Sequence, residues 1–244
     1  MPLSGNWPVG VGRVVLPEVD STNAEAARRA ARFAGPEWIL ALRQAKGRGR
    51  RGRAWQDPAG NFAASYLLRP DMPPAQAALY SFVASLALQD ALVGATGRAD
   101  GFALKWPNDV LLHGAKLAGI LLEATGPDLA IGIGVNLVAH PDPEEGALRP
   151  VSLMGETGLR IAPEELLDLL APAFAHWQAQ FTTYGFAPIR TAWLARAARL
   201  GERIVARTTH DTYEGTFEGI DASGALVLRG GQGARAIPAA DVFF

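Results

Sequence analysis

Five cations and three glycines occupy the eight positions from Lys46 to Arg53, within the stretch QAKGRGRRGRAW. Arginine guanidinium groups carry forked donors that match phosphate or carboxylate oxygens, and glycines let backbone N–H groups approach a ligand closely. No acidic residue separates these like charges, so we expect the segment to be mobile when no anion is bound. The composition predicts an anion-binding loop, although a solvated charged loop or an RNA-binding tract would share it.

A further cation, Lys105, opens the stretch KWPND at the end of an expected strand. Side chains alternate between the two faces of a strand, so Phe102, Leu104 and Trp106 share one face. Lys105 lies on the opposite face, away from these bulky apolar groups. This placement indicates a lysine that can contact a ligand, and an ordinary surface lysine is the alternative.

Glycines line one face of a third stretch, IGIGVNL, where Gly132, Gly134 and Asn136 alternate with apolar residues. Gly119 contributes a similar gap in the neighbouring segment KLAGILLEA. A strand face without side chains leaves space above the sheet. Together the glycines predict a cleft for a small ligand, and close packing of a helix is the alternative. The stretch lacks the third glycine of a dinucleotide-binding fingerprint.

The stretch DSTN, residues 20–23, has the composition of a helix start. Thr22 and Glu25 match the spacing of a capping box, in which a hydroxyl and a carboxylate satisfy free backbone N–H groups. The hydroxyls of Ser21 and Thr22 and the amide of Asn23 could also recognise a polar ring at the helix N-terminus.

The remaining composition limits what these groups can bind. The chain has 244 residues, 23 Lys and Arg against 24 Asp and Glu, and a formal net charge of −1. The protein as a whole is therefore no polyanion binder, and any anion site must be local. The absence of cysteine excludes disulfides, thiolate metal sites and cysteine nucleophiles, and fits a reducing compartment.

Alternating strand and helix patterns position these motifs. We expect strands at 12–19, 37–44, 61–69, 101–109 and 129–138, a hairpin around His113 and Gly114, and helices at 21–33, 73–95, 163–185 and 188–199. The tail, residues 200–244, changes to short strands separated by glycine turns, which predicts a small β-barrel. The pattern indicates an α+β or α/β layered fold.

The N-terminal stretch lacks the basic start and apolar run of a signal peptide. We also find no run of eighteen apolar residues, so no membrane-spanning segment is expected. These two observations predict a cytoplasmic protein without a membrane partner.

Taken in order, the motifs resemble those of the biotin–protein ligases. STN, Q-x-x-GRGRRGR-x-W, KWPND, KLAGIL-x-E and GIGVNL follow one another between Ser21 and Leu137. The resemblance implies an α+β fold: a mixed β-sheet with packed helices, similar to class II synthetases and lipoate ligases, over residues 1–199. An SH3-like β-barrel would follow at 200–244. Lipoate and octanoyl transferases share the fold but are not expected to have the arginine loop.

Biotin–protein ligases use biotin and ATP, with Mg²⁺ accompanying the nucleotide. The resemblance implies formation of biotinyl-5′-AMP and pyrophosphate, followed by transfer of biotin to a lysine of a biotin carboxyl carrier protein. A cationic loop would bring the carboxylate and the polyphosphate together and then cover the mixed anhydride. No cluster in the sequence has clean metal-ligand spacing, so the metal ligands are not assigned, and the phosphates would supply much of the coordination.

The same resemblance assigns roles to individual residues. Lys105 and Arg50 are the implied catalytic residues, with Lys105 stabilising charge and not acting as a nucleophile. The implied biotin contacts are Ser21, Thr22, Asn23, Gln44, Gly47, Arg48, Gly49, Arg50, Lys105 and Gly119. The implied nucleotide contacts are Arg50, Arg51, Arg53, Trp55, Asn108 and Asn136.

Two other functions compete with this interpretation. One is a nucleic-acid-binding protein that uses the arginine loop and the β-barrel, which the near-zero net charge and the scarcity of aromatic residues among the arginines disfavour. The other is a ligase for lipoate or another acyl acid. Some biotin–protein ligases carry an N-terminal winged helix-turn-helix, but DSTN begins here at residue 20, so we expect a monofunctional ligase that binds no DNA. A homodimer is possible within the family.

Overall fold

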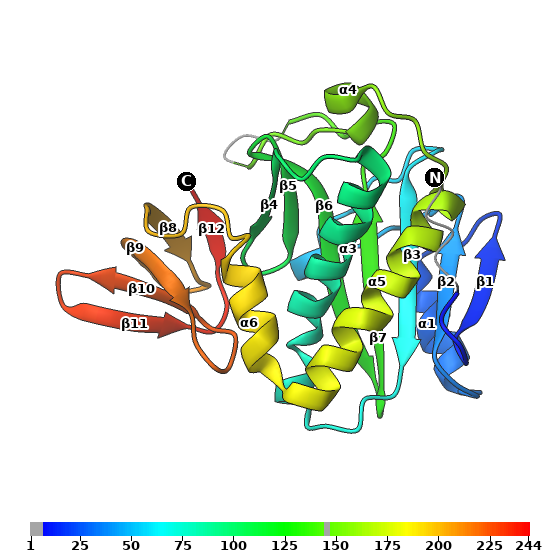
Figure 1. Ribbon diagram of the computed structural model, residues 1–244, viewed down its shortest axis with the longest axis horizontal. Coiled ribbons are helices and arrows are strands. Elements are labelled where there is room, and N and C mark those ends of the chain that lie inside the picture. The colour runs from blue at the N-terminus through cyan, green and yellow to red at the C-terminus, as the bar shows by residue number, and fades with distance from the viewer. Residues whose placement is uncertain (1–6, 144–146) are drawn as a thin grey trace.

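The computed structural model describes residues 7–143 and 147–244. Residues 1–6, part of the stretch on which the targeting prediction rests, lie outside this range, as do residues 144–146 of the 1–199 segment. The described chain forms a large mixed sheet covered by helices and a smaller antiparallel sheet beside it (Figure 1). The α+β fold expected from the sequence is confirmed.

The large sheet has seven strands in the order β1-β2-β3-β7-β6-β5-β4. Only β1 and β2 are parallel among these pairs, which makes the sheet mixed. The strands are β1 (Gly12–Leu16), β2 (Glu37–Ala41), β3 (Phe62–Leu68), β4 (Phe102–Lys105), β5 (Asp109–Leu112), β6 (Ala115–Thr125) and β7 (Asp128–Val135). The tight turn between β5 and β6 lies at His113 and Gly114, both at positive φ, as the hairpin prediction required.

Alternation along the strands gives the sheet two apolar faces. Ile39 of β2 and Leu67 of β3 pack against Ala26 of helix α1 (Thr22–Ala30) on one face. Trp38 and Tyr66, one residue earlier on the same strands, belong to the main core on the other face. Helices α3 (Tyr80–Thr96) and α5 (Pro163–Tyr184) cover that face (Figure 1).

The predicted helix over 73–95 is divided into a short helix α2 (Pro74–Ala77) and α3. Among the described residues, the stretch Pro74–Thr96 is long and apolar enough to cross a membrane by composition, but most of it is buried inside the protein. Its apolarity is that of a core helix packed against both the sheet and the neighbouring helix α5. The expected second C-terminal helix is shorter than predicted, as α6 (Phe186–Leu194), and a short helix α4 (Leu153–Thr157) precedes α5.

The tail folds into a five-stranded antiparallel sheet in the order β11-β10-β9-β8-β12. Its strands are β8 (Arg203–Arg207), β9 (Thr212–Ile220), β10 (Leu226–Gly230), β11 (Gly233–Ile237) and β12 (Asp241–Phe243). Phe217 and Leu226 join the main core cluster, so the two sheets share one apolar interior. The buried Trp106 Nε1 donates to the Gly224 carbonyl at 2.9 Å, a further link between them. The small sheet therefore packs firmly against the rest of the protein.

Candidate active site

A cavity of about 610 Å³ lies over β6 and β7, and the arginine loop and strand β12 also line it. This volume is in the range of pockets for small organic ligands. The predicted site residues that line it are Ser21, Thr22, Asn23, Gln44, Arg48, Gly49, Arg50, Arg53, Trp55, Lys105, Asn108, Gly119 and Asn136. Gly47 and Arg51 are not among the lining residues. The motifs that are distant in sequence thus meet in one place.

The N-terminus of α1 supplies a polar wall, but not through the predicted capping box. Ser21 is the N-cap and Thr22 is the first helical residue, and the Ser21 side chain makes no capping hydrogen bond. Instead the N–H and hydroxyl of Thr22 both donate to Oε1 of Gln44, at 2.8 and 3.2 Å. Glu25 pairs with Arg28 and Arg29 of its own helix. The capping-box prediction was wrong because a distant side chain satisfies the free N–H.

Asn23 is fixed by a buried hydrogen-bond network. Its Nδ2 donates to a carboxylate oxygen of Glu123 at 2.7 Å, and Ser65 Oγ donates to its Oδ1 at 2.6 Å. The amide lies directly over Gly132, where a Cβ would come within 2.5 Å of Asn23 Oδ1. Because Gly132 has no side chain, the Asn23 amide can lie against the sheet at the pocket wall.

Two other glycines make room for the indole of Trp55. Gly119 of β6 and Gly134 of β7 are directly paired across the sheet. A Cβ at Gly134 would lie 2.5 Å from Trp55 Cε2, and one at Gly119 would lie 3.3 Å from its Cζ3. Trp55 therefore covers part of the glycine face that was predicted from the sequence. The buried Nε1 of Trp55 has no hydrogen-bond partner among the described residues. The cleft lies beside this indole.

Two lysines flank one carboxylate at the floor of the pocket. Lys105 is 8% exposed, and its Nζ lies 3.9 Å from Oδ2 of Asp109, the residue paired with it across β4 and β5. Lys116 Nζ lies 2.8 Å from the other oxygen of Asp109. Burial lowers the pKa of Lys105; Asp109 opposes this shift and Lys116 adds to it. Lys105 is thus a buried cation, and the surface-lysine alternative is wrong.

Sequence reasoning did not single out Lys116 or Asp109. KLAGIL was singled out for its glycine and not for its lysine, because nothing in the sequence shows which lysine lies near Lys105. The register of β5 against β6, which pairs Asp109 with Gly119 across a β-bulge, brings the three groups together. Asp109 directly follows KWPN, so the only local signal was a carboxylate four residues after a buried lysine.

The arginine loop is held by a carboxylate from the opposite end of the sequence. Asp241 of β12 accepts from Arg51 at 2.7 Å and from Arg53 at 3.0 Å, and lies 3.9 Å from Arg50. Arg48 pairs with Glu123 at 3.4 Å. These exposed pairs each contribute only about 0–1 kcal/mol, but they offset the repulsion within the loop. Arg51 therefore faces Asp241, outside the pocket lining, at a left-handed φ of 56°.

Arg50 is the loop cation placed deepest toward the two lysines. Its Nη1 donates to Oδ1 of Asn108 at 3.4 Å, and Asn108 in turn donates to the carbonyl of Ile120 at 2.6 Å. Burial lowers the pKa of the Arg50 guanidinium, and the carboxylates of Asp241 and Asp109 oppose that shift. Asn108 is thus bonded on both sides by the protein and orients Arg50.

The other predicted residues have structural partners as well. Asn136 is buried and donates from Nδ2 to the carbonyl of Val151 at 3.1 Å, while its Oδ1 has no partner among the described residues. Gly47 accepts at its carbonyl from the N–H of Trp55 at 2.9 Å, and a Cβ there would lie 2.5 Å from the Trp55 carbonyl oxygen. Gly47 thus allows the two sides of the loop to approach each other.

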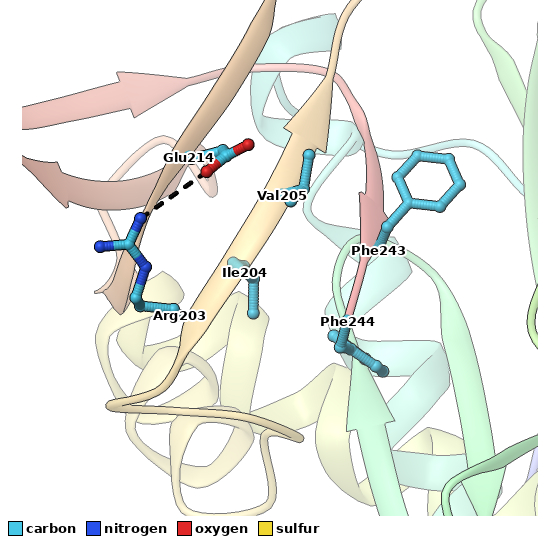
Figure 2. Close-up of a pocket in the computed structure, with 6 residues that line it drawn as sticks. All are labelled: Arg203, Ile204, Val205, Glu214, Phe243 and Phe244. Carbon is cyan, nitrogen blue, oxygen red and sulfur yellow. Dashed lines mark ion pairs between the residues drawn. The ribbon is translucent and has the colours of Figure 1, made fainter.

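A second hollow, of about 330 Å³, lies on the small sheet (Figure 2). Its residues are Arg203, Ile204, Val205, Glu214, Phe243 and Phe244. The only ion pair drawn there joins the exposed Arg203 and Glu214 at 3.6 Å. This hollow lacks the convergent polar groups of the larger pocket, so the larger pocket is the candidate active site.

Comparison with known proteins decides between the families that share this fold. The model of the biotin/lipoate A/B protein ligase family matches residues 15–137, and that of the biotin protein ligase C-terminal domain matches residues 200–244. The biotin–[acetyl-CoA-carboxylase] ligase of Paracoccus denitrificans is 60% identical over 94% of this chain and 99% of its own length. The chain belongs to the biotin protein ligase family.

More distant biotin protein ligases agree in sequence and in structure. The bifunctional ligase/repressor BirA of Bacillus subtilis is 30% identical, over 94% of this chain and 73% of its own length. The structure of the Aquifex aeolicus biotin protein ligase in complex with biotin and ATP has a TM-score of 0.85 at 27% identity. That match covers 95% of this chain and 98% of the Aquifex chain. The arginine loop and the two lysines therefore lie in the pocket of a biotin protein ligase, and a nucleic-acid-binding function is not favoured.

Proposed function

We propose that this ligase forms biotinyl-5′-AMP from biotin and ATP and transfers biotin to a lysine of a biotin carboxyl carrier protein. The observation that carries the proposal is the meeting of Lys105, Lys116 and Arg50 in one pocket, beside the polar wall made by Thr22 and Asn23. Biotin has a carboxylate at one end and a polar ureido ring at the other. The cations suit the first group and the polar wall suits the second.

In the first half-reaction an oxygen of the biotin carboxylate attacks the α-phosphorus of ATP. The bond from that phosphorus to the bridging oxygen breaks, and pyrophosphate leaves. Both reactants are anions, so their approach is opposed by Coulomb repulsion. Lys105 and Arg50 stabilise the negative charge as it gathers on the phosphorus oxygens, and neither forms a covalent bond. Lys116, held by Asp109, adds a third positive charge in the same place.

In the second half-reaction the carrier lysine attacks the biotinyl carbonyl, AMP leaves with the bonding electron pair, and the amine loses a proton. The arginine loop has to retain the adenylate until the carrier arrives. Gln44, Arg48 and Gly49 line the biotin side of the pocket in this proposal. Trp55, Arg53 and Asn136 line the nucleotide side, with Arg51 and Gly47 shaping the loop behind them.

Mg²⁺ enters this proposal as part of the nucleotide. Among residues 7–143 and 147–244 no group of three or more His, Asp or Glu side chains is placed to hold a metal ion. The carboxylate of Asp109 in the pocket is already flanked by two lysines. The described side chains therefore leave the metal ligands unassigned, and the nucleotide phosphates would supply much of the coordination.

The partner and the compartment follow from the same proposal. We expect the carrier to be that of acetyl-CoA carboxylase, because the Paracoccus ligase is named for this substrate. The expected compartment is the cytoplasm. A homodimer is a further expectation that gel filtration with light scattering would decide.

Incubation with biotin, ATP, Mg²⁺ and a purified carrier domain tests the function directly. Mass spectrometry should show the carrier gaining one biotinyl group, only when all four components are present. Lipoate offered in place of biotin should give no product. A carrier modified by lipoate and not by biotin would favour the acyl-ligase alternative.

The contact between Gly134 and Trp55 gives a first prediction for a variant. Gly134→Ala places a methyl group where the indole lies, and such overlap costs about 1–3 kcal/mol. Trp55 should move from the sheet, and the KM for ATP should rise about tenfold. Gly231→Ala, at a surface glycine with open space around it, is the matched control. An unchanged KM for ATP in a folded Gly134→Ala protein would contradict the assignment of Trp55 to the nucleotide side.

A further inference from the structure

The arginine loop is closed at its base by a carboxylate that no role above explains. Oδ2 of Asp57 accepts the backbone N–H of Gln44 at 2.8 Å, and these residues lie on the two sides of the loop. Farther out, the N–H of Gly49 donates to the carbonyl of Arg53 at 2.7 Å. The hydrogen bond between Asp57 and Gln44 is therefore the tie that closes the base of the loop.

Gln44 connects this tie to the pocket. Its side-chain Oε1 accepts from the N–H and the hydroxyl of Thr22, and its side chain lines the cavity. Thr22 Oγ1 also lies 2.8 Å from Ser65 Oγ, within hydrogen-bond distance. A hydrogen-bonded chain thus runs from Asp57 through one residue to the polar wall. A change at Asp57 should reach biotin through Gln44.

The surroundings of Asp57 do not favour its charged form. The side chain is half-buried, and its Oδ1 is enclosed without a hydrogen-bond partner among the described residues. Burial raises the pKa of Asp57 to about 6, and the hydrogen bond from the Gln44 N–H opposes that shift. No charged side chain of the described residues contributes to it. The carboxylate is therefore ionised at neutral pH, and among the residues that the structure describes a single N–H, that of Gln44, is bonded to it.

This ionisation lowers the stability of the fold. Because the pKa in the folded state is above the ordinary value of 3.8, the stability that Asp57 contributes is fully present below pH 3.8. It is lost as the pH rises through about 6, so at pH 8 the folded protein holds a poorly solvated carboxylate. An amide of the same shape would avoid this loss.

We propose that Asp57 is a positioning residue whose ionised carboxylate fixes Gln44 and the base of the arginine loop for biotin binding. The inference rests on the proposed function. A hydrogen bond from an N–H to an anionic oxygen is stronger than one to a neutral oxygen, so ionisation tightens the tie. Biotin should therefore bind more tightly as the pH rises through the titration of Asp57, while the fold becomes less stable.

The test is the KM for biotin in biotin-dependent exchange of pyrophosphate into ATP, measured from pH 5.5 to 8. Asp57→Ala removes the acceptor, and the KM for biotin at pH 7.5 should rise about tenfold with a smaller change in kcat. Asp57→Asn keeps an acceptor oxygen without a charge. Its KM for biotin should lose the step near pH 6, and its thermal unfolding temperature at pH 8 should be at or above that of the wild type.

Asp168→Asn is the matched control, since Asp168 is an exposed carboxylate of α5 that pairs with Arg13 outside the pocket. Its KM profile should follow the wild type. Should Asp57→Ala fail to fold, the pH profile of Asp57→Asn decides the matter. A wild-type KM and pH profile in Asp57→Asn would overturn the inference, whereas a wild-type protein without any biotin-dependent exchange would overturn the proposed function itself.

Discussion

Lys105→Ala should slow formation of the adenylate about 100-fold while changing the affinity for biotin alone far less. Lys105 is a buried cation whose charge Asp109 supports, and it lies in the pocket that receives both reacting anions. Loss of one preorganised charge-stabilising group typically costs about 100- to 1,000-fold in rate. Its effect falls on the transition state because negative charge gathers there. Single-turnover formation of biotinyl-5′-AMP, compared with calorimetric binding of biotin in the absence of ATP, measures both quantities.

Lys46→Ala supplies the control for a general loss of positive charge. Lys46 is an exposed cation at the start of the loop and does not line the pocket. Its removal should leave adenylate formation within about twofold of the wild type, as is usual for screened surface charges. Equal losses of adenylate formation and biotin affinity in Lys105→Ala would contradict the transition-state role.

Arg50→Gly should release the adenylate roughly tenfold or more faster than the wild type, because the loop loses its most deeply placed guanidinium. A hydrogen bond to a charged group contributes about 1.5–3 kcal/mol, which corresponds to about 10- to 100-fold in retention. The Asn108 side chain would also lose its Arg50 partner. The measurement is the rate at which biotinyl-5′-AMP appears in a filtrate without carrier, followed by its hydrolysis.

Arg43→Gly is the comparison for this variant. Arg43 precedes the loop, pairs with Glu18 on the surface and has no contact with the cavity. Release from Arg43→Gly should match the wild type. If Arg50→Gly released biotinyl-5′-AMP as slowly as the wild type, the loop would not retain the adenylate through Arg50.

Much of the fold follows from local patterns in the sequence. The apolar runs that became β2 and β3 predicted strands, and the structure places Trp38 and Ile39 of β2 on opposite faces of the sheet. The turn at His113 and Gly114 followed from its composition. Boundaries depend on tertiary contacts and were less predictable. The break between α2 and α3, for instance, has no proline or glycine to mark it.

The candidate site was predictable where the direction of a side chain follows from the strand alternation within a single motif. Lys105 faced away from the apolar side of its strand, as alternation required, and the glycines of β6 and β7 marked the pocket face. Contacts between distant segments were not predictable. Asp241 meets the arginine loop only because β12 packs beside it, and Thr22 bonds to Gln44 because β2 ends next to α1. For the same reason the expected repulsion among the arginines is offset by carboxylates far away in the sequence.

Exchange of labelled pyrophosphate into ATP is the most direct test of whether this pocket joins a carboxylate to the α-phosphate. With pure, folded protein, exchange should require biotin, be absent with lipoate, and fall about 100-fold in Lys105→Ala. Exchange that proceeds equally well without biotin, or none at all in its presence, would contradict the account.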